Sequence, residues 1–301
     1  DVQLSDGKYT FYFEEDGGVF RGFKTIDDKL YYFNTGKGEL VRGAMMVIDN
    51  KKYYFDDNTG EAVTGPVKVK STGLSYVFDP ASEQGVLLGM AKFNDATYFL
   101  DEETGVMRFG YWSVGRDAYY FDRDNGQMLV NASIEDTYIG LNIQADAQGR
   151  LSFSILNDSG RATALYYALQ KVGVSYGTGE DQLVCSSLVS YAYSMAGMND
   201  LNNLESFEQM LKCKENGWFI EPSKGDNLDD ILEPGDLVFW QKPGCEDVEC
   251  DHVDEVHHVG LYLGKNQMVE ASEQEGIMLI RDIQMDDATY PIYGYAKVPL
   301  N

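Results

Sequence analysis

The first 131 residues repeat one pattern of apolar and turn-forming positions. A glycine recurs every 21 to 24 residues, and a cluster of two or three aromatic or apolar residues lies midway between consecutive glycines. The glycines are Gly22, Gly43, Gly65, Gly89 and Gly110, and the clusters are residues 31–33, 53–55, 76–78, 98–100 and 119–121. After most clusters, Asp or Asn opens a polar turn with glycine, and a short apolar segment follows. This order predicts one β-hairpin per repeat.

A single hairpin of this kind cannot bury its own aromatic face. Stacked neighbours can, because the aromatic residues of one repeat cover those of the next, and the outermost turns then act as caps. We therefore expect an all-β solenoid of hairpin repeats over residues 1–131, with the repeated part running from about residue 8.

Residues 22–34 and 49–56 resemble the cell-wall-binding repeats of Gram-positive surface proteins and clostridial toxins. The resemblance implies that a cell-wall polymer or glycan binds the repeats. In choline-binding relatives, tryptophans after the glycine and before the tyrosine pair form a cage for a quaternary ammonium. Here Phe23 and Leu30 occupy those positions in the first such repeat, so a choline cage is not expected. A glycan site between repeats and a simple spacer built on aromatic staples are the two alternatives.

The pattern changes after residue 131. Residues 132–156 lose the repeat and alternate apolar with polar positions, which predicts a connecting hairpin. Apolar positions at helical spacing then predict a helix over residues 161–172, capped by Asp158 or Ser159. A second helix is expected from Cys185 to about residue 195. We therefore expect a second domain over residues 157–301.

Three strands and two turns follow in this second domain. Residues 233–240 read as a turn that leads into a buried strand, and residues 258–264 read as a further strand. A hairpin at residues 265–266 returns the chain through residues 268–272. Adjacent antiparallel strands would place His258 and Glu270 side by side, with the helix that carries Cys185 packed across the sheet.

Cys185, His258 and Glu270 then supply a thiol nucleophile, its base and a group that orients the base. The start of a helix offers Cys185 free amides and the positive end of the helix dipole. Together with an imidazolium these lower the pKa of a thiol, which becomes a nucleophile at neutral pH.

Four motifs in this order resemble the NlpC-type peptidoglycan endopeptidases, which have a papain-like α+β fold. They are Cys-Ser-x-Leu-Val from Cys185, Pro-Gly-Asp-Leu-Val-Phe from Pro234, His-Val-Gly-Leu-Tyr-Leu-Gly from His258, and an apolar-x-Ala-Ser segment around Glu270. The resemblance implies that Cys185, His258 and Glu270 are catalytic, and it places Tyr176 and Ser186 at the substrate. Two positions depart from the family pattern: Val184 stands where Asp is usual, and Ser187 where Gly is usual.

The resemblance also implies a reaction. The family cleaves the peptidoglycan stem peptide at the bond between the γ-carboxyl of D-glutamate and the diamino acid, and no cofactor is needed. Two alternatives stay open: an inert wall-binding scaffold, motivated by Val184 and Ser187, and a papain-like amidase or transpeptidase that acts on a different amide.

Residues 241–257 form an acidic insertion relative to the family, and three of its residues could have a separate function. Cys245 and Cys250 could form a disulfide, could bind zinc with His252 and with Cys213, or could be free thiols. The carboxylates between Glu246 and Glu255 could attract the cationic amine of the diamino acid.

Composition narrows the partners and the compartment. The 301 residues carry 24 Lys plus Arg against 49 Asp plus Glu, and a net charge of -25 repels nucleic acids. No apolar run approaches the length of a membrane span, so no membrane span is expected. The chain opens at Asp1 rather than Met, as it would after removal of a signal peptide or an upstream region. We expect a secreted protein associated with a Gram-positive-type cell wall.

Overall fold

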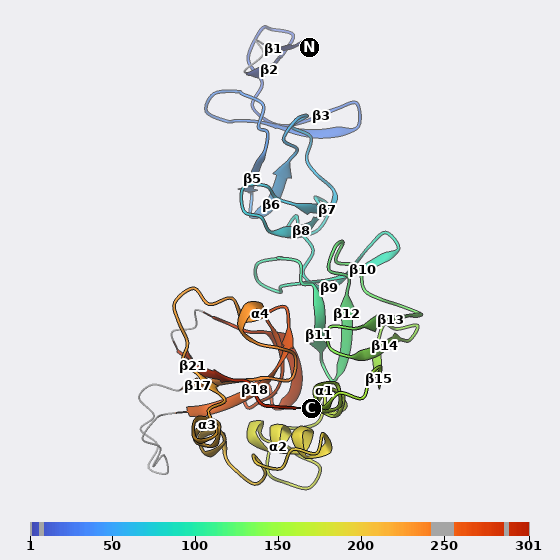
Figure 1. Ribbon diagram of the computed structural model, residues 1–301. Coiled ribbons are helices and arrows are strands. Elements are labelled where there is room, and N and C mark those ends of the chain that lie inside the picture. Colours follow the sequence, from blue (N-terminus) through green and yellow to red (C-terminus); the bar gives the residue numbers. More distant parts are fainter. Residues whose placement is uncertain (1, 6–8, 242–255, 286–288, 301) are drawn as a thin grey trace. The chain divides into compact units, whose positions relative to one another are not determined.

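The computed structural model describes residues 2–5, 9–241, 256–285 and 289–300. The chain forms two units, which differ in colour and architecture in Figure 1. Unit 1 contains Asp1–Gly110 and Phe121–Met128, and unit 2 contains Tyr111–Tyr120 and Leu129–Asn301. Unit 2 therefore takes in residues 111–120, which lie within the repeats of the sequence, as well as the chain from Leu129 onward.

Unit 1 is a series of two-stranded antiparallel hairpins, as the repeats predict. They pair β1 (Val2–Ser5) with β2 (Thr10–Phe13), β3 (Gly22–Ile26) with β4 (Lys29–Phe33), β5 (Ala44–Ile48) with β6 (Lys51–Phe55), β7 (Gly65–Lys68) with β8 (Ser75–Phe78), and β9 (Gly89–Phe93) with β10 (Ala96–Leu100). Each repeat glycine has a positive φ, between 60° and 100°, and lies at the first residue of the first strand of its hairpin or, for Gly43, directly before it. Side chains other than glycine rarely adopt that conformation, which explains why glycine recurs there.

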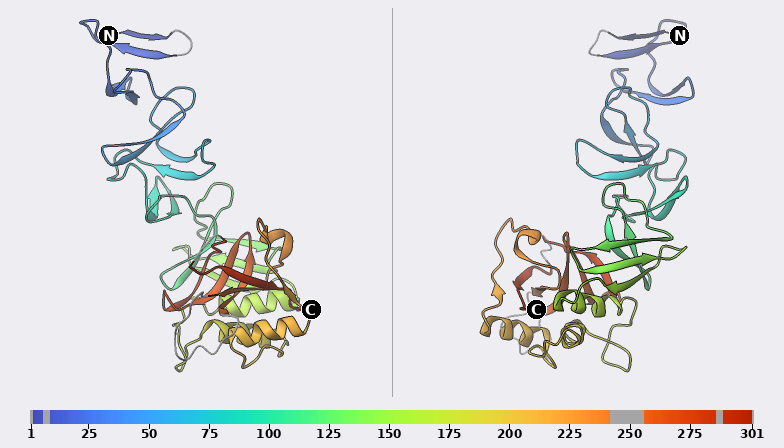
Figure 2. Two further views of the ribbon diagram at one scale, coloured as in Figure 1. Left: turned by 90° about the vertical axis from the view of Figure 1, so that its left-hand side faces the viewer. Right: turned by 45° about the vertical axis from the view of Figure 1, so that its right-hand side comes forward.

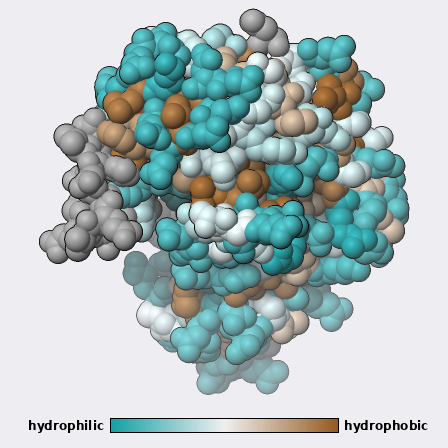
Figure 3. Space-filling view, turned by 90° about the horizontal axis from the view of Figure 1, so that it is seen from below, coloured by the Kyte–Doolittle hydropathy of each residue, from teal (hydrophilic) through white to brown (hydrophobic). Residues whose placement is uncertain are grey.

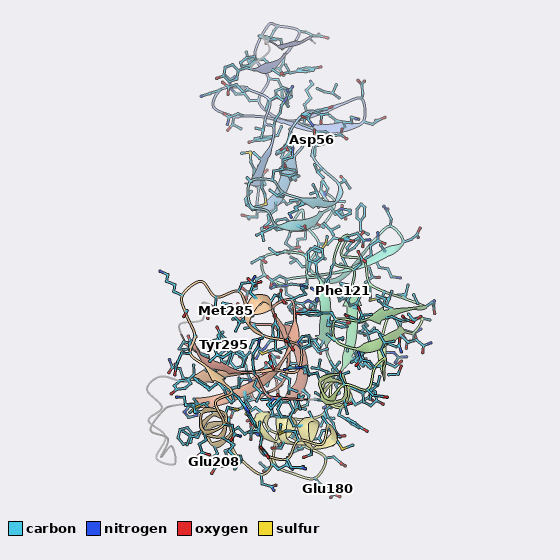
Figure 4. The ribbon with its side chains drawn as sticks, in the orientation of Figure 1. Asp56, Phe121, Glu180, Glu208, Met285 and Tyr295 are labelled. Atoms are coloured by element: carbon cyan, nitrogen blue, oxygen red, sulfur yellow. The ribbon has the colours of Figure 1, made fainter. Side chains whose placement is uncertain are left out.

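The polar turn after each hairpin is fixed by the side chain that opens it. Asp56, labelled in Figure 4, accepts the backbone N–H groups of Asn58 at 2.9 Å and Thr59 at 2.7 Å through the same oxygen. These bonds hold the pKa of Asp56 below its ordinary value. The equivalent residues Asn34, Asp101 and Asp122 make the same pair of bonds to the turn that follows them.

Aromatic rings join consecutive repeats, which confirms the predicted stacking. The rings of Tyr32 and Phe55 stack with centroids 5.9 Å apart, and those of Tyr54 and Phe78 do so at 6.0 Å. The backbone continues the contact, because Ala62 N–H donates to the carbonyl of Leu30 in the preceding repeat at 2.7 Å. Each hairpin thus buries its aromatic face only because a neighbour covers it.

Unit 2 is built around a six-stranded antiparallel sheet of order β16-β21-β17-β18-β19-β20. Its strands are β16 (Phe219–Ile220), β17 (Leu237–Gln241), β18 (Val256–Gly264), β19 (Gln267–Ser272), β20 (Ile277–Asp282) and β21 (Ile292–Ala296). Its helices are α1 (Gly160–Leu169), α2 (Cys185–Met195), α3 (Ser206–Glu215) and α4 (Leu228–Ile231). Helices α2 and α3 pack against β18, and α1 packs on α2 (Figures 1 and 2).

Local signals in the sequence place several of these elements correctly. Helix α1 is capped by Ser159, whose hydroxyl accepts the N–H of Ala162 at 3.1 Å. Lys265 and Asn266, at the turn between β18 and β19, have φ of 54° and 60°, the backbone of the expected tight hairpin.

Residues 132–156 form more than the expected connecting hairpin. They build a three-stranded antiparallel sheet of β13 (Ala132–Asp136), β14 (Leu141–Ala145) and β15 (Leu151–Ile155). Leu141 and Ile143 are fully buried in the same core as α1 and α2, so this sheet is part of unit 2. The sequence misses β13 because none of its side chains is fully buried and its apolar alternation is weak.

The central sheet is buried on both faces by two separate clusters. One face packs with the helices, through residues such as Leu188, Phe239 and Val269. The other face carries Trp240, Tyr262, Met268 and Tyr295, the last of which is labelled in Figure 4. Strands covered on both faces read as continuous apolar runs, which is the pattern of residues 237–240 and 259–263.

The turn before β17 is held by a buried ion pair. Asp236 is fully buried, and one of its oxygens accepts a bond from the guanidinium of Arg161 at 2.7 Å. Its other oxygen accepts the N–H of Glu233 at 2.8 Å. Arg161 also donates to the carbonyls of Pro234 and Val298, both at 3.2 Å, so one side chain links α1, this turn and the C-terminal segment.

The surface seen in Figure 3 is mostly hydrophilic, with hydrophobic residues in separate patches. Within the part of the chain that the structure describes, no helix is long and apolar enough to cross a membrane.

Because Asp236 is the buried partner of Arg161, replacing it should destabilise unit 2. In Asp236→Ala the guanidinium of Arg161 loses its buried partner, and we expect the free energy of unfolding to fall by about 3 kcal/mol. Urea unfolding of the full-length protein, followed by a probe in unit 2, measures this change.

Glu233→Gln is the matched control. Glu233 also pairs with Arg161, at 3.3 Å, but its side chain is 63% exposed, so its replacement should cost less than about 1 kcal/mol. Equal effects of the two substitutions would contradict the assignment of the buried pair.

Candidate active site

Cys185 is the first residue of α2, and its thiol faces the backbone of β18. The preceding residue, Val184, has an extended backbone and forms the N-cap of the helix. The thiol donates to the carbonyl of His257 across 3.9 Å, and the backbone amides of Val259 and Ser186 point at the sulfur. The residue is only 7% exposed. The sulfur is therefore surrounded by amide donors that stabilise its thiolate form.

His258 lies on β18, directly opposite Trp240 of β17, and the two ring centroids are 5.4 Å apart. Its Nε2 makes a short contact with Glu270, and the imidazole also hydrogen-bonds the thiol of Cys185. The ring is thus held between the thiol and the carboxylate, with its side chain 25% exposed.

Glu270 lies on β19 and is fully buried. One carboxylate oxygen contacts His258, and the other forms an ion pair with Arg281 of β20. The buried carboxylate therefore has a cationic partner on each side.

Electrostatics favour a charged thiol and imidazole. Burial raises the pKa of Cys185, but the hydrogen bond and charge of His258 and the two amides outweigh it, and the pKa lies below the ordinary value. Burial lowers the pKa of His258, yet the charge of Glu270 and the bond to Cys185 raise it to about 10. Burial also opposes ionisation of Glu270, and His258 and Arg281 overcome it, so that its pKa is lowered. All three shifts favour the charged forms, a thiolate beside an imidazolium.

Of the two residues expected at the substrate, Ser186 follows Cys185 in α2, and Tyr176 is near enough for the charge of Cys185 to act on its phenol. Burial, the Cys185 thiolate and Glu273 raise the pKa of Tyr176 to about 12, so its phenol stays protonated and can donate a hydrogen bond. Ser186 is 8% exposed, its amide points at the sulfur, and its carbonyl accepts a bond from the side chain of Gln209 at 3.0 Å. Ser186 thus contributes its backbone to the surroundings of the thiol.

Ser187 gives the helix start a hydrogen-bonded cap. Its hydroxyl accepts the N–H of Val184 at 2.7 Å and donates to the carbonyl of Val184 at 2.9 Å. The valine side chain has no polar atom with which to cap the helix, so the serine closes the turn from within. The two departures from the family pattern therefore occur together and compensate each other at the backbone that carries Cys185.

The model of the NlpC/P60 family matches residues 173–290, a range that includes Cys185, His258 and Glu270. Residues 173–290 are an NlpC/P60 domain. Members of this family are generally cysteine peptidases or amidases that act on peptidoglycan.

The solved structures that match part of this chain include a choline-binding protein, an autolysin and an endolysin. Choline-binding protein F from Streptococcus pneumoniae is 20% identical, with a TM-score of 0.37, and the match covers 50% of this chain and 47% of that one. The modular autolysin LytC from Streptococcus pneumoniae is 15% identical, with a TM-score of 0.37 and coverages of 50% and 33%. The pneumococcal cell-wall endolysin from phage Cp-1 is 23% identical, with a TM-score of 0.31 and coverages of 42% and 36%. The chain thus spans about half or less of the length of each. A comparison with curated proteins finds no match.

The acidic insertion at residues 241–257 contains the candidates for a disulfide or a zinc site. Cys245, Cys250 and His252, together with the carboxylates between Glu246 and Glu255, lie outside the described residues. Cys213, the further zinc ligand considered, is fully buried in the helix-side core, and burial raises its pKa to about 12. A thiolate metal ligand needs the opposite shift. Among the described residues, no group of three or more His, Cys, Asp and Glu could hold a metal ion.

Arg281 is the residue of the NlpC/P60 domain that sequence reasoning missed. It is the one cation in β20, after a run of apolar residues. It reaches Glu270 only because β19 and β20 pair with Met268 opposite Arg281 and Glu270 opposite Leu279, which places both charges on one face. Arg281 could be found from the sequence only through the register of β19 with β20, and that register depends on where the turn between the two strands lies.

Cys185 should react with iodoacetamide at unusually low pH. Its pKa is lowered from the ordinary thiol value of 9.0, so half-maximal alkylation should occur below pH 9.0. In His258→Ala the midpoint should rise by about one pH unit or more, because the imidazolium no longer stabilises the thiolate. Mass spectrometry of the peptide that contains Cys185 measures the rate separately from the other cysteines.

Cys213 is the internal comparison, since its buried thiol, with a pKa of about 12, should stay unmodified at the same pH. A Cys185 midpoint at or above 9.0 in the wild type would rule out a pre-formed thiolate.

Arg281→Gln should move the loss of stability at acid pH to higher pH. The substitution removes a charge that favours the ionised form of Glu270, so the Glu270 pKa rises. A carboxylate with a lowered pKa stabilises the fold above its unfolded pKa, and this stability is lost as the pH falls through the folded value. In the variant that loss begins at higher pH, and at pH 7 the free energy of unfolding should fall by about 1 to 3 kcal/mol.

Urea unfolding and alkylation of Cys185, each measured from pH 4 to pH 8, test this expectation. Arg281→Lys keeps the charge and should recover most of both effects. An Arg281→Gln variant with wild-type profiles would show that Glu270 does not need the second cation.

Proposed function

We propose that the protein is a secreted cell-wall hydrolase that cuts peptidoglycan stem peptides between the γ-carboxyl of D-glutamate and the diamino acid. The observation that carries the proposal is the contact of His258 with both Cys185 and Glu270 inside an NlpC/P60 domain. A thiolate with an adjacent imidazolium, oriented by a buried carboxylate, is the chemistry that acyl transfer from an amide requires.

The first half of the reaction forms an acyl-enzyme. The thiolate of Cys185 attacks the amide carbonyl carbon, a C–S bond forms, and the carbonyl electrons move to oxygen. The amide at the start of α2, that of Cys185 itself, stabilises the oxyanion. The C–N bond then breaks as the imidazolium of His258 gives its proton to the leaving amine, which is the amino group of the diamino acid.

The second half releases the D-glutamyl product. Neutral His258 takes a proton from water, and the water oxygen attacks the thioester carbonyl. The C–S bond breaks, the thiolate of Cys185 is restored, and the imidazolium is formed again. Glu270 holds the ring in the orientation that both transfers need, and its negative charge stabilises the imidazolium in the resting enzyme.

The hairpin repeats supply the second part of the function. We propose that they bind a wall polymer or glycan and hold the domain near its substrate. The net charge of -25 agrees with a partner other than nucleic acid. No choline cage is proposed, because the positions of the cage tryptophans hold other residues, among them Phe23 and Leu30.

Digestion of purified peptidoglycan tests the proposal. Wild-type protein should release stem fragments that end in D-glutamate, together with fragments that begin with the diamino acid, and mass spectrometry identifies both. Cys185→Ala should release neither, with activity reduced by a factor of about 10³ or more, because the nucleophile is absent.

Cys213→Ala is the matched control, since it removes a buried thiol of the same chain that has no part in the proposed chemistry. Unchanged peptidoglycan with wild type would favour a wall-binding scaffold. Fragments from any other bond would favour a papain-like amidase or transpeptidase.

A further inference from the structure

The hairpin of β11 (Gly110–Val114) and β12 (Asp117–Phe121) continues the repeat pattern in sequence but belongs largely to unit 2. The N–H of Tyr111 donates to the side-chain oxygen of Gln267 at 3.0 Å, and the Gln267 amide donates to the Tyr111 carbonyl at 2.8 Å. Gln267 is 1% exposed, and it begins β19, the strand that carries Glu270. One buried side chain therefore pairs with the backbone of β11 as a neighbouring strand would.

The same hairpin reaches β20, which is the last strand of the central sheet. Ile280 N–H donates to the hydroxyl of Ser113 at 2.8 Å. Further along that edge, Met278 exchanges backbone bonds with the segment that leads to the site: Gly173 N–H donates to its carbonyl, and its N–H donates to Val174, both at 2.8 Å. The hairpin and residues 173–176 thus both bond the β20 edge of the sheet.

Arg116, in the turn of the hairpin, holds this segment from outside. Its guanidinium donates one bond to the carbonyl of Gly173 and another, at 3.2 Å, to the hydroxyl of Ser175. The backbones touch here, since Gly173 has a φ of +83° and a Cβ on it would lie 2.3 Å from the carbonyl oxygen of Arg116. The fork geometry of arginine suits two acceptors two residues apart.

The segment that Arg116 holds ends at Tyr176. Its N–H donates to the carbonyl of Gly276 at 2.8 Å, so the backbone of Tyr176 is fixed from the β20 side as well. Its phenol lies close enough to Cys185 for the thiolate to affect its pKa. Because Tyr176 follows Ser175 in the chain, a shift of Ser175 would also move the side chain of Tyr176.

We propose that Arg116 is a positioning residue that holds Tyr176 in place for the substrate, so that a hairpin with the sequence of a repeat sets the affinity of the NlpC/P60 domain. The inference rests on the proposed function for the identity of the substrate. Arg116 touches neither the thiol nor the imidazole in any described contact, so it acts through residues 173–176 and not on the nucleophile.

Kinetics on a soluble stem peptide test this role in the full-length protein. Arg116→Ala should raise KM about tenfold and leave kcat within about twofold, because the substrate wall moves while the thiolate is intact. The alkylation profile of Cys185 should not change. Arg116→Lys, which can make only one of the two bonds, should fall between wild type and Arg116→Ala.

Arg150→Ala is the matched control. Arg150 lies in unit 2 and bonds Asp146 at 2.8 Å on the hairpin of β14 and β15, so its loss should leave KM unchanged. Equal KM values for Arg116→Ala and wild type would overturn the proposal. So would a fall of both kcat and the alkylation of Cys185 in Arg116→Ala.

Two further measurements test the role of Arg116 without requiring peptide cleavage. Hydrogen exchange at the amide of Tyr176, read by mass spectrometry, should be faster in Arg116→Ala than in wild type even if no peptide is cleaved. Ser175→Ala removes only one of the bonds and should add nothing to Arg116→Ala in the double variant. If wild type cleaves no stem peptide, the proposed function fails, while unchanged exchange would show that Arg116 does not hold this segment.

Discussion

The arrangement of the site depends on the fully buried carboxylate of Glu270. A buried charge is costly unless cations and hydrogen bonds compensate it, and here each oxygen has a cationic partner: His258 on one side and Arg281 on the other. The same contact raises the pKa of His258, and the imidazolium in turn lowers that of Cys185. Two negative and two positive groups thus balance, and each keeps its neighbour charged.

This balance explains why the strands around the site must pair in one register. Glu270 reaches His258 from β19 and Arg281 from β20, so a slip of one residue in either pairing would turn a charge to the helix side of the sheet. The tight turn at Lys265 and Asn266 fixes the first register. The register of β19 with β20 is fixed by the apolar residues on both faces of the sheet, because a slip would exchange them with charged residues.

Much of this could be predicted from the sequence, because its signals are local or carried by motifs. The repeats follow from glycines that need positive φ and from aromatic clusters that need a neighbour, and both features recur at a fixed spacing. The meeting of His258 with Glu270 follows from one hairpin. Arg281 and Arg116 could not be found this way, because their partners lie across a second strand pairing and 57 residues along the chain, respectively. The first strand of the three-stranded sheet could not be found either, because its apolar pattern is weak.

The start of α2 shows how a family pattern can change without loss of the backbone that the chemistry needs. An aspartate before the cysteine could cap the helix with its side chain, and a glycine at the third position would leave that cap undisturbed. Here Val184 cannot cap, and Ser187 bonds both the N–H and the carbonyl of Val184. The cap has moved from one side of the cysteine to the other, while the amides of Ser186 and Val259 still point at the sulfur. What the exchange removes is a negative charge next to a thiolate, and since like charges raise the pKa of an acid, its absence favours the ionised nucleophile.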